Sequence, residues 1–271
     1  MKIKLHTLTF SPTDTSRKII HAISQGTGFE NISHTDITFQ SSLSQCIYGP
    51  DDLLIIGVPV YGGHVAPTAM QRMKDLQGNG ALAVGVVVYG NRHYEHALEE
   101  LADFLGGRDF HLIGAGTFIG EHSYSTSETP IAVGRPDASD IAYAKKFGEE
   151  IARKILSSSP DSVIDVRNIE QPEQDEQVMM QFKHTVMGWI KDGVHMPDTP
   201  IVDDALCTHC HACADICPTQ AINDNDVEAG KCIKCCACVK GCPVGARSFP
   251  TPFAPLLARA FTQRKENMFL L

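Results

Sequence analysis

Nine of the ten cysteines in this 271-residue chain lie between Cys207 and Cys242, and eight of them repeat one spacing. The pattern C-x2-C-x2-C-x3-C-P occurs twice, and the second copy follows the first by 25 residues. Inside a cell, cysteines at this density bind metal more often than they form disulfides. The eight repeated cysteines are Cys207, Cys210, Cys213, Cys217, Cys232, Cys235, Cys238 and Cys242.

The spacing suits iron–sulfur clusters for a geometric reason. Three thiolates separated by two residues let one loop surround a [4Fe–4S] cube, and the cysteine before proline lies past a turn and reaches the other cluster. We therefore expect one cluster on Cys207, Cys210, Cys213 and Cys242, and a second on Cys232, Cys235, Cys238 and Cys217. The alternative is a pair of structural zinc sites, although zinc favours two separated C-x2-C pairs around one ion.

Residues 201–249 resemble a bacterial-type two-cluster ferredoxin. The resemblance implies one electron per cluster, at potentials that depend on hydrogen bonds to sulfur and on solvent access. Cys236 departs from the family pattern, and we interpret it as a buried residue or free thiol beside a cluster, or else as a competing ligand. His209 and His211 stand between ligands and are expected to point outward or to lie behind the ligands. The distant Cys46 is expected to be a buried apolar residue.

The first 157 residues alternate short apolar runs with amphipathic stretches, which predicts an open parallel α/β sheet. The continuously apolar run at Leu53–Val60 is typical of a strand that helices cover on both faces. The expected strands are Ile3–Phe10, Asp36–Phe39, Leu53–Val60, Ala81–Tyr89 and Phe110–Phe118. The expected helices are Thr15–Ser24, Pro67–Leu76, Tyr94–Leu105 and Ser139–Leu156, the last with Ser139 as its N-cap.

Three loops follow expected strands at the edge where parallel α/β sheets bind ligands. The first is rich in hydroxyls and enters a helix, so it could bind a phosphate monoester. The second has glycines that let a planar ring approach the backbone, and a tyrosine that can stack on it. The candidate ligand residues are Ser11, Thr13, Thr15 and Ser16; Pro59, Val60, Tyr61, Gly62 and Gly63; and Tyr89, Gly90, Asn91, Arg92 and Tyr94.

Residues 1–157 resemble the flavodoxin family, and specifically its fusions to two-cluster ferredoxins. The resemblance implies a flavodoxin-like five-stranded parallel sheet followed by an α+β two-cluster ferredoxin domain. It also implies an FMN phosphate on Ser11, Thr13, Thr15 and Ser16, with the flavin ring between the loops 59–63 and 89–94. The phosphate loop departs from the family, because Pro12 and Asp14 stand at positions that are usually glycine.

The remaining segments are assigned by composition. Four parts are expected: a flavodoxin-like FMN domain at 1–157, a linker at 158–200, the ferredoxin domain at 201–249 and a C-terminal tail at 250–271. The linker contains Ser157–Pro160 and an apolar stretch at Val178–Ile190 without a clean period, which we interpret as a partly ordered strap. The tail is expected to hold a short amphipathic helix at Pro255–Arg264.

Two motifs imitate functional sites. The glycines of Gly114–Gly120 follow a strand, but the last lies one residue too late for a dinucleotide-binding fingerprint. Glu121, His122 and Ser123 have the side chains of a catalytic cluster. Adjacent residues rarely point at one substrate, so a loop or interdomain role is expected for them.

Composition limits the partners. A net charge of −9 disfavours binding to nucleic acid, which needs a basic face on the protein. The same charge suits association with basic redox proteins. The sequence leaves open which redox protein is the partner and whether the chain forms a homo-oligomer. The N-terminus lacks a signal peptide and the apolar runs are too short for a membrane span, so a cytoplasmic protein is expected.

We expect electron transfer between FMN, two [4Fe–4S] clusters and an external redox partner in a low-potential, anaerobic metabolism. The alternatives are a flavin-dependent reductase of a small acceptor and a redox or oxygen sensor.

Overall fold

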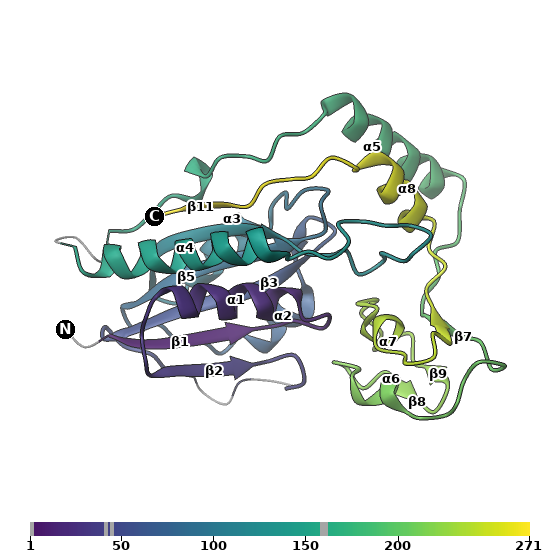
Figure 1. Ribbon diagram of the computed structural model, residues 1–271, viewed down its shortest axis with the longest axis horizontal. Helices are drawn as coiled ribbons and strands as arrows, with labels where there is room; N and C mark the ends of the chain where they lie inside the picture. Colours follow the sequence, from purple (N-terminus) through teal and green to yellow (C-terminus); the bar gives the residue numbers. More distant parts are fainter. Residues whose placement is uncertain (1–2, 41–42, 44–45, 158–161) are drawn as a thin grey trace.

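The computed structural model describes residues 3–40, 43, 46–157 and 162–271 (Figure 1). Its central sheet has five parallel strands in the order β2-β1-β3-β5-β6. This is the flavodoxin-like order 2-1-3-4-5, so the expected parallel α/β fold is confirmed. The five strands are β1 (Lys4–Thr9), β2 (Ile32–Asp36), β3 (Asp52–Tyr61), β5 (Ala81–Tyr89) and β6 (Phe110–Ile119). A short strand, β4 (His64–Val65), pairs antiparallel with the end of β3.

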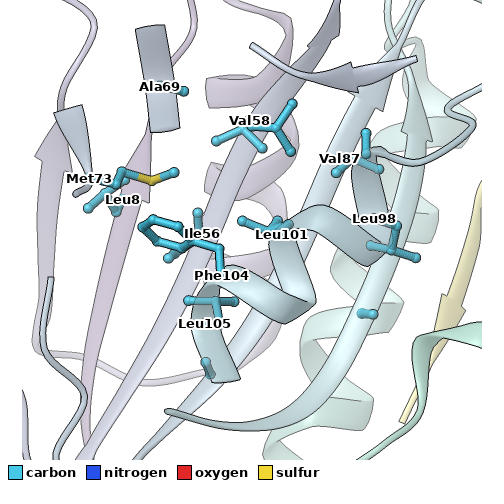
Figure 2. Close-up of a cluster of buried hydrophobic side chains, with 14 of the residues drawn as sticks. Leu8, Ile56, Val58, Ala69, Met73, Val87, Leu98, Leu101, Phe104 and Leu105 are labelled. Carbon is cyan, nitrogen blue, oxygen red and sulfur yellow. The ribbon is translucent and has the colours of Figure 1, made fainter. Parts of the chain in front are cut away.

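Helices cover both faces of this sheet, which explains the continuously apolar β3. Leu54, Ile56 and Val58 contribute to a core with α2 and α3 (Figure 2), and Leu53 and Ile55 contribute to a second core with α1 and α4. Alternate side chains of a strand point to opposite faces, so a strand between two helical layers must be apolar throughout. The helices are α1 (Thr15–Gly26), α2 (Pro67–Arg72), α3 (Ala97–Gly106) and α4 (Ala138–Ile155).

Several expected boundaries were wrong. Strand β2 ends at Asp36 instead of beginning there, because the buried Ile37 that suggested a strand lies just beyond it. Helix α2 ends four residues before Leu76, and α3 begins three residues after Tyr94. The N-cap of α4 is Asp137, whose carboxylate accepts hydrogen bonds from the N–H groups of Ser139 and Asp140.

The segment interpreted as a partly ordered strap contains a helix, α5 (Glu176–Lys191). Its buried face contains Met179 and Phe182, and the Phe182 ring lies 5.3 Å from that of Phe261, the residue that follows helix α8 (Phe253–Ala260). The prediction failed because Met180 and Met187 place apolar side chains on the solvent side and obscure the helical period. A 3₁₀ turn, η1 (Val166–Asn168), precedes α5, while the Ser/Pro residues at 158–161 lie outside the described residues.

The C-terminal tail returns to the sheet (Figure 1). Its last strand, β11 (Met268–Leu270), pairs antiparallel with β6 and extends the five parallel strands at that edge. The side-chain oxygen of Asn267 accepts a hydrogen bond from the N–H of Ile119 at 3.0 Å, and its amide donates to Asp140 at 2.7 Å. These buried contacts anchor the tail, and its helix α8 ends earlier than the expected Arg264.

The cysteine-rich region, residues 201–249, lies beyond the ends of the parallel strands (Figure 1). It contains two similar halves that pair crosswise, with the first strand of each half antiparallel to the last strand of the other. The backbone repeats in detail: His209 and His211 have positive φ angles, as do Lys234 and Cys236 25 residues later. The elements are β7 (Ile201–Val202), α6 (Ala212–Asp215), β8 (Ile222–Asn223), β9 (Asp226–Val227), α7 (Ala237–Lys240) and β10 (Arg247–Ser248).

Of the helices that the structure describes, none combines the length and the apolar character that crossing a lipid bilayer requires.

Candidate functional site

The loop after β1 forms a small polar hollow at the N-terminus of α1. The backbone of Asp14 is left-handed, with φ 68°, a conformation that favours glycine and so accords with the family position. Its carboxylate contacts Arg17 Nε at 2.6 Å and Lys18 Nζ at 3.7 Å. These two cations balance the negative charge of Asp14, which would otherwise repel a phosphate bound near this loop. The hydroxyl of Ser11 accepts a hydrogen bond from the N–H of Arg17 at 3.1 Å and so shapes the loop.

Two further observations fit a phosphate in this hollow. The hydroxyl of Ser16 is fully buried and has no hydrogen-bond partner among the described residues, so a ligand oxygen would satisfy it. A Cβ added to Gly120 would lie 2.8 Å from the Thr15 side chain, so glycine keeps the entrance open. Expected residues Ser11, Thr13, Thr15 and Ser16 all line this hollow, together with Pro59, Val60, Tyr61, Tyr89 and Gly90.

A larger cavity of about 620 Å³, here called the sheet-edge cavity, continues from the small hollow. The two share Tyr61, Tyr89, Gly90 and His122 in their walls. The expected Gly62, Gly63 and Arg92 also line it, and both glycines have positive φ angles. Polar groups at one end and a wide, partly apolar chamber at the other suit a molecule with a phosphate tail and a flat ring system.

Several residues of this cavity were missed or interpreted differently from sequence. His122 and Ser123 line it because they follow β6, the fifth parallel strand, whose end reaches the same edge. Burial lowers the pKa of His122 to about 4, with Arg92 and Lys240 nearby adding to the effect, so the ring is neutral at pH 7. The far wall consists of α5 and α8 side chains: Phe182, Lys183, Val186, Met187, Phe253 and Leu257. In the sequence, the four-residue spacing of Phe182 and Val186 was the signal that could have indicated a helix with one face toward the cavity.

Two expected ligands do not line the cavity. Asn91 is buried, and its amide donates to the carbonyls of Phe261 and Gln263 at 2.8 and 2.9 Å. It therefore holds the C-terminal tail beside the loop. Tyr94 is buried in the main core, with its ring 5.7 Å from that of Tyr89. Both follow β5 as the sequence suggested, but the chain turns them inward.

The eight repeated cysteines line two hollows, four in each. The outer hollow is lined by the outer set: Cys207, Cys210, Cys213 and Cys242. The inner hollow is lined by the inner set: Cys217, Cys232, Cys235 and Cys238. Cys210 is exposed, whereas Cys235 and Cys238 are buried. In the part of the chain that the structure describes, no three His, Cys, Asp or Glu side chains are arranged to hold a single metal ion.

Backbone N–H groups point at sulfur in both halves. Ala221 donates to Cys217 Sγ and Ala246 donates to Cys242 Sγ, each at 3.2 Å. Such bonds stabilise thiolates, which a positively charged metal centre requires. Burial raises the pKa of Cys235 to about 12, so this sulfur would release its proton only when a cation binds.

The additional residues between the ligands differ in location. Cys236 is buried, lines the inner hollow beside the inner set, and directs its Sγ to the Lys234 carbonyl at 3.7 Å. His209 and His211 are exposed and lie at the rim of the outer hollow. Cys46 is half-buried and packs against the main core.

The inner hollow adjoins the sheet-edge cavity. Ile233 lines both, and Lys234 lines the cavity. Burial raises the pKa of Tyr61 in the cavity wall, and the sulfurs of Cys235 and Cys236 raise it further. Two long-range contacts fix the arrangement: Lys240 Nζ to Glu121 at 2.6 Å, and the buried Arg72 to the Pro218 carbonyl at 2.5 Å.

Comparison with known proteins gives one family match and several similar solved structures. Residues 200–223, which include the first cysteine motif, match the family described as 4Fe-4S binding domain. A flavodoxin from the domain Archaea is similar at 12% identity, with 57% of this chain and 100% of that chain covered and a TM-score of 0.41. An apo NADH:FMN oxidoreductase is similar at 14% identity, with 59% and 95% covered and a TM-score of 0.40.

A third similar structure is rubredoxin oxygen:oxidoreductase from the anaerobe Desulfovibrio gigas. It has 12% identity and a TM-score of 0.38, and the match covers 56% of this chain but 35% of that chain. No curated protein sequence matches this one. The strand order and the 4Fe–4S match together define a flavodoxin-like α/β fold followed by an iron–sulfur region, a combination suited to electron transfer.

Proposed function

We propose that this protein transfers electrons between FMN, two [4Fe–4S] clusters and an external redox protein. The FMN phosphate would occupy the hollow lined by Ser11, Thr13, Thr15 and Ser16, and its ring the sheet-edge cavity beside Tyr61 and Tyr89. The inner and outer cysteine sets would each hold one cluster. When bound, FMN exchanges one or two electrons and each cluster exchanges one. The proposed division of the chain is an FMN domain at 1–157, a linker at 158–200 and a two-cluster domain at 201–249. The C-terminal tail at 250–271 completes the FMN domain.

One observation carries this proposal: the inner hollow and the sheet-edge cavity share a wall. Ile233 lines both spaces, and its neighbours Cys232 and Lys234 line the inner hollow and the cavity respectively. With both cofactors bound, two redox sites would lie next to each other within one chain, which would replace docking of separate carriers by a high effective concentration. The proposed sites would form a linear order, with the outer set, which contains the exposed Cys210, as the end that another protein can approach.

The charge of the cysteine-rich region supports this direction. Residues 201–228 contain six acidic residues and no lysine or arginine, whereas residues 229–249 contain four basic residues and no acidic one. The basic half contacts the sheet through Lys240, whereas the acidic residues of the first half are exposed, and one of them, Asp224, lines the outer hollow. Leu206 and Val244 beside it are 52% and 42% exposed. An apolar centre with an acidic rim fits a redox protein whose cofactor edge is surrounded by lysines or arginines.

Cofactor content tests the proposal directly. Protein purified without oxygen should contain FMN together with iron and acid-labile sulfide in the amounts of two [4Fe–4S] clusters, about eight of each per chain. Stoichiometric zinc without sulfide, or the absence of flavin after reconstitution with FMN, would contradict it. Substituting Ser16 by Val should weaken FMN binding while leaving iron unchanged, because the buried hydroxyl serves only the phosphate hollow. Ser24→Val, another buried serine of α1 remote from the hollow, is the control.

The size of the cavity favours a second candidate function, a flavin-dependent reductase of a small acceptor. The chamber extends past the flavin loops to Lys183, Met187 and Leu257 and includes Arg92. Apolar walls with three basic side chains, Arg92, Lys183 and Lys234, would accept a planar organic anion. Turnover of such an acceptor by the pure protein, with dithionite as the only reductant and no other protein present, would favour this function over electron transfer to a partner.

A further inference from the structure

The cysteine-rich region buries an arginine that the protein itself leaves largely unpartnered. Arg247 on β10 is 4% exposed. One guanidinium nitrogen, Nη2, donates to the Asp224 carbonyl at 3.4 Å, but Nε and Nη1 are buried without a hydrogen-bond partner in the described structure. A buried cation with unsatisfied donors is destabilising unless an anionic group compensates it.

The internal repeat shows that the fold does not require this charge. The residue 25 positions earlier, Ile222, occupies the equivalent place on β8 and is likewise buried, at 8% exposed. The backbone just before each is the same, since Ala221 and Ala246 both donate to a cysteine sulfur at 3.2 Å. An apolar side chain therefore suffices at this position in the first half, and the arginine of the second half must serve something else.

The surroundings of Arg247 identify the missing partner. Arg247 lines the outer hollow together with all four cysteines of the outer set. A [4Fe–4S] cluster on four thiolates is an anion with sulfur acceptors, and hydrogen bonds and charges around such a cluster set its potential.

We propose that the Arg247 guanidinium is the buried cationic partner of the cluster on the outer set, donating N–H hydrogen bonds to its sulfur and favouring its reduced state. This inference rests on the proposed function. Reduction by one electron adds one negative charge to the cluster without a change in the cysteine ligands, so a fixed cation stabilises the reduced form more than the oxidised form. Because Ile222 gives the inner set no such cation, the arginine would separate the potentials of two otherwise similar clusters.

The test compares three substitutions in the full-length protein loaded with clusters. Arg247→Ile restores the residue of the first half, Arg247→Gln removes the charge with a similar shape, and Arg247→Lys keeps the charge. Anoxic redox titrations monitored by electron paramagnetic resonance give the midpoint potential of each cluster. The outer cluster is recognised as the one whose signal changes in Cys210→Ala.

The isoleucine and glutamine variants should lower the midpoint potential of the outer cluster, with a smaller change at the inner one. At the wild-type midpoint, at least a tenfold smaller ratio of reduced to oxidised cluster is expected, which corresponds to 59 mV for one electron. The lysine variant should keep most of the wild-type potential. If the isoleucine variant does not assemble clusters, the comparison of potentials between the glutamine and lysine variants tests the inference.

Unchanged potentials in the glutamine variant, or equal shifts in the glutamine and lysine variants, would overturn the inference. Loss of clusters in all three variants would also overturn it, because the side chain would then be needed for folding and not for its charge. A wild-type protein without iron and sulfide would instead refute the proposed function, so the two failures are distinguishable.

Discussion

The two halves of the cysteine-rich region share a backbone and differ in nearly everything else. Both have the same cysteine spacing, the same pair of left-handed residues and the same N–H to sulfur contact. The first half is acidic and has the exposed Cys210, while the second is basic and has the buried Cys235. The backbone thus provides the cluster geometry, and the side chains determine what surrounds each cluster.

The difference follows from where the two halves lie. The second half faces the sheet, so its lysines meet Glu121 and the sheet-edge cavity, and its cysteines lose contact with water. The first half contacts the sheet domain through the Pro218 carbonyl, but its six acidic residues are exposed, where carboxylates are well hydrated. One duplicated motif can therefore provide both a contact with the sheet and a surface for another protein. If this asymmetry is real, substitutions in the two halves should have different effects.

Removing one ligand from each half should give unequal losses. In Cys210→Ser the outer cluster is impaired, but the inner set remains packed against the sheet, so iron should fall by about half. In Cys235→Ser the defect lies in a buried site on which the fold of the region depends, so both clusters should be lost. Iron and sulfide per chain and far-UV circular dichroism measure this. Equal losses in the two variants would mean that burial does not distinguish the halves.

The second-largest effect is expected from a substitution that breaks the contact between the cysteine-rich region and the sheet. Arg72 is 7% exposed and donates to the carbonyls of Ile37, Thr38 and Pro218, the last being adjacent to Cys217 of the inner set. Arg72→Met would leave these carbonyls unsatisfied and should lower the free energy of unfolding by about 3 kcal/mol. It should also disturb the inner cluster more than the outer one.

Denaturant unfolding and cluster spectra check this expectation. Arg259→Met is the matched control, because Arg259 is exposed and makes only a local contact with the Pro255 carbonyl. A change below about 0.5 kcal/mol is expected for the control. An Arg72 variant as stable as the control would show that the contact contributes nothing.

The parallel sheet could be predicted because buried strands carry a strong signal. Strand β5 begins and ends at the expected residues Ala81 and Tyr89, and all of its side chains are buried. Strand β2 was misplaced because it is an edge strand, largely polar and partly exposed. Apolar content reports burial, so an element at the margin of the sheet leaves little trace in the sequence.

The site was anticipated where local geometry decides and missed where distant segments meet. Cysteine spacing and the loops after β1 and β3 are local, and the structure places them around the hollows and the cavity. The far wall from α5 and α8, and the use of Asn91 to hold the tail, depend on chain segments 90 to 170 residues apart. The sequence offers no rule for such pairings, and the ligand roles themselves stay predictions.

The acidic half should control association with cationic partners. Asp224→Asn combined with Asp226→Asn should slow reduction of hexaammineruthenium(III) by the reduced protein roughly twofold to tenfold at low salt. The effect should vanish at high salt, because the screening length falls to about 3 Å at 1 M. Stopped-flow rates measure it, with the remote, exposed Asp192→Asn as control. An unchanged rate in the double variant would show that these acidic residues do not contribute to the proposed docking surface.

The smallest expected effect concerns the ion pair between the basic half and the sheet. Lys240 and Glu121 are 27% and 28% exposed, so Lys240→Gln should lower the free energy of unfolding by no more than about 1 kcal/mol. Burial raises the pKa of Glu121, but hydrogen bonds from Lys240 and from the N–H of Gly134 outweigh it and the pKa is lowered.

A lowered pKa fixes the sign of the pH dependence. The contribution of Glu121 is fully present above its unfolded pKa of about 4.3 and is lost as pH falls through the lower folded value. The stability difference between wild type and Lys240→Gln should therefore be constant near neutral pH and shrink in acid. Lys231→Gln, which breaks a local pair with Glu228 outside the contact with the sheet, is the control. A difference that grows in acid would mean that Lys240 acts on another group than Glu121.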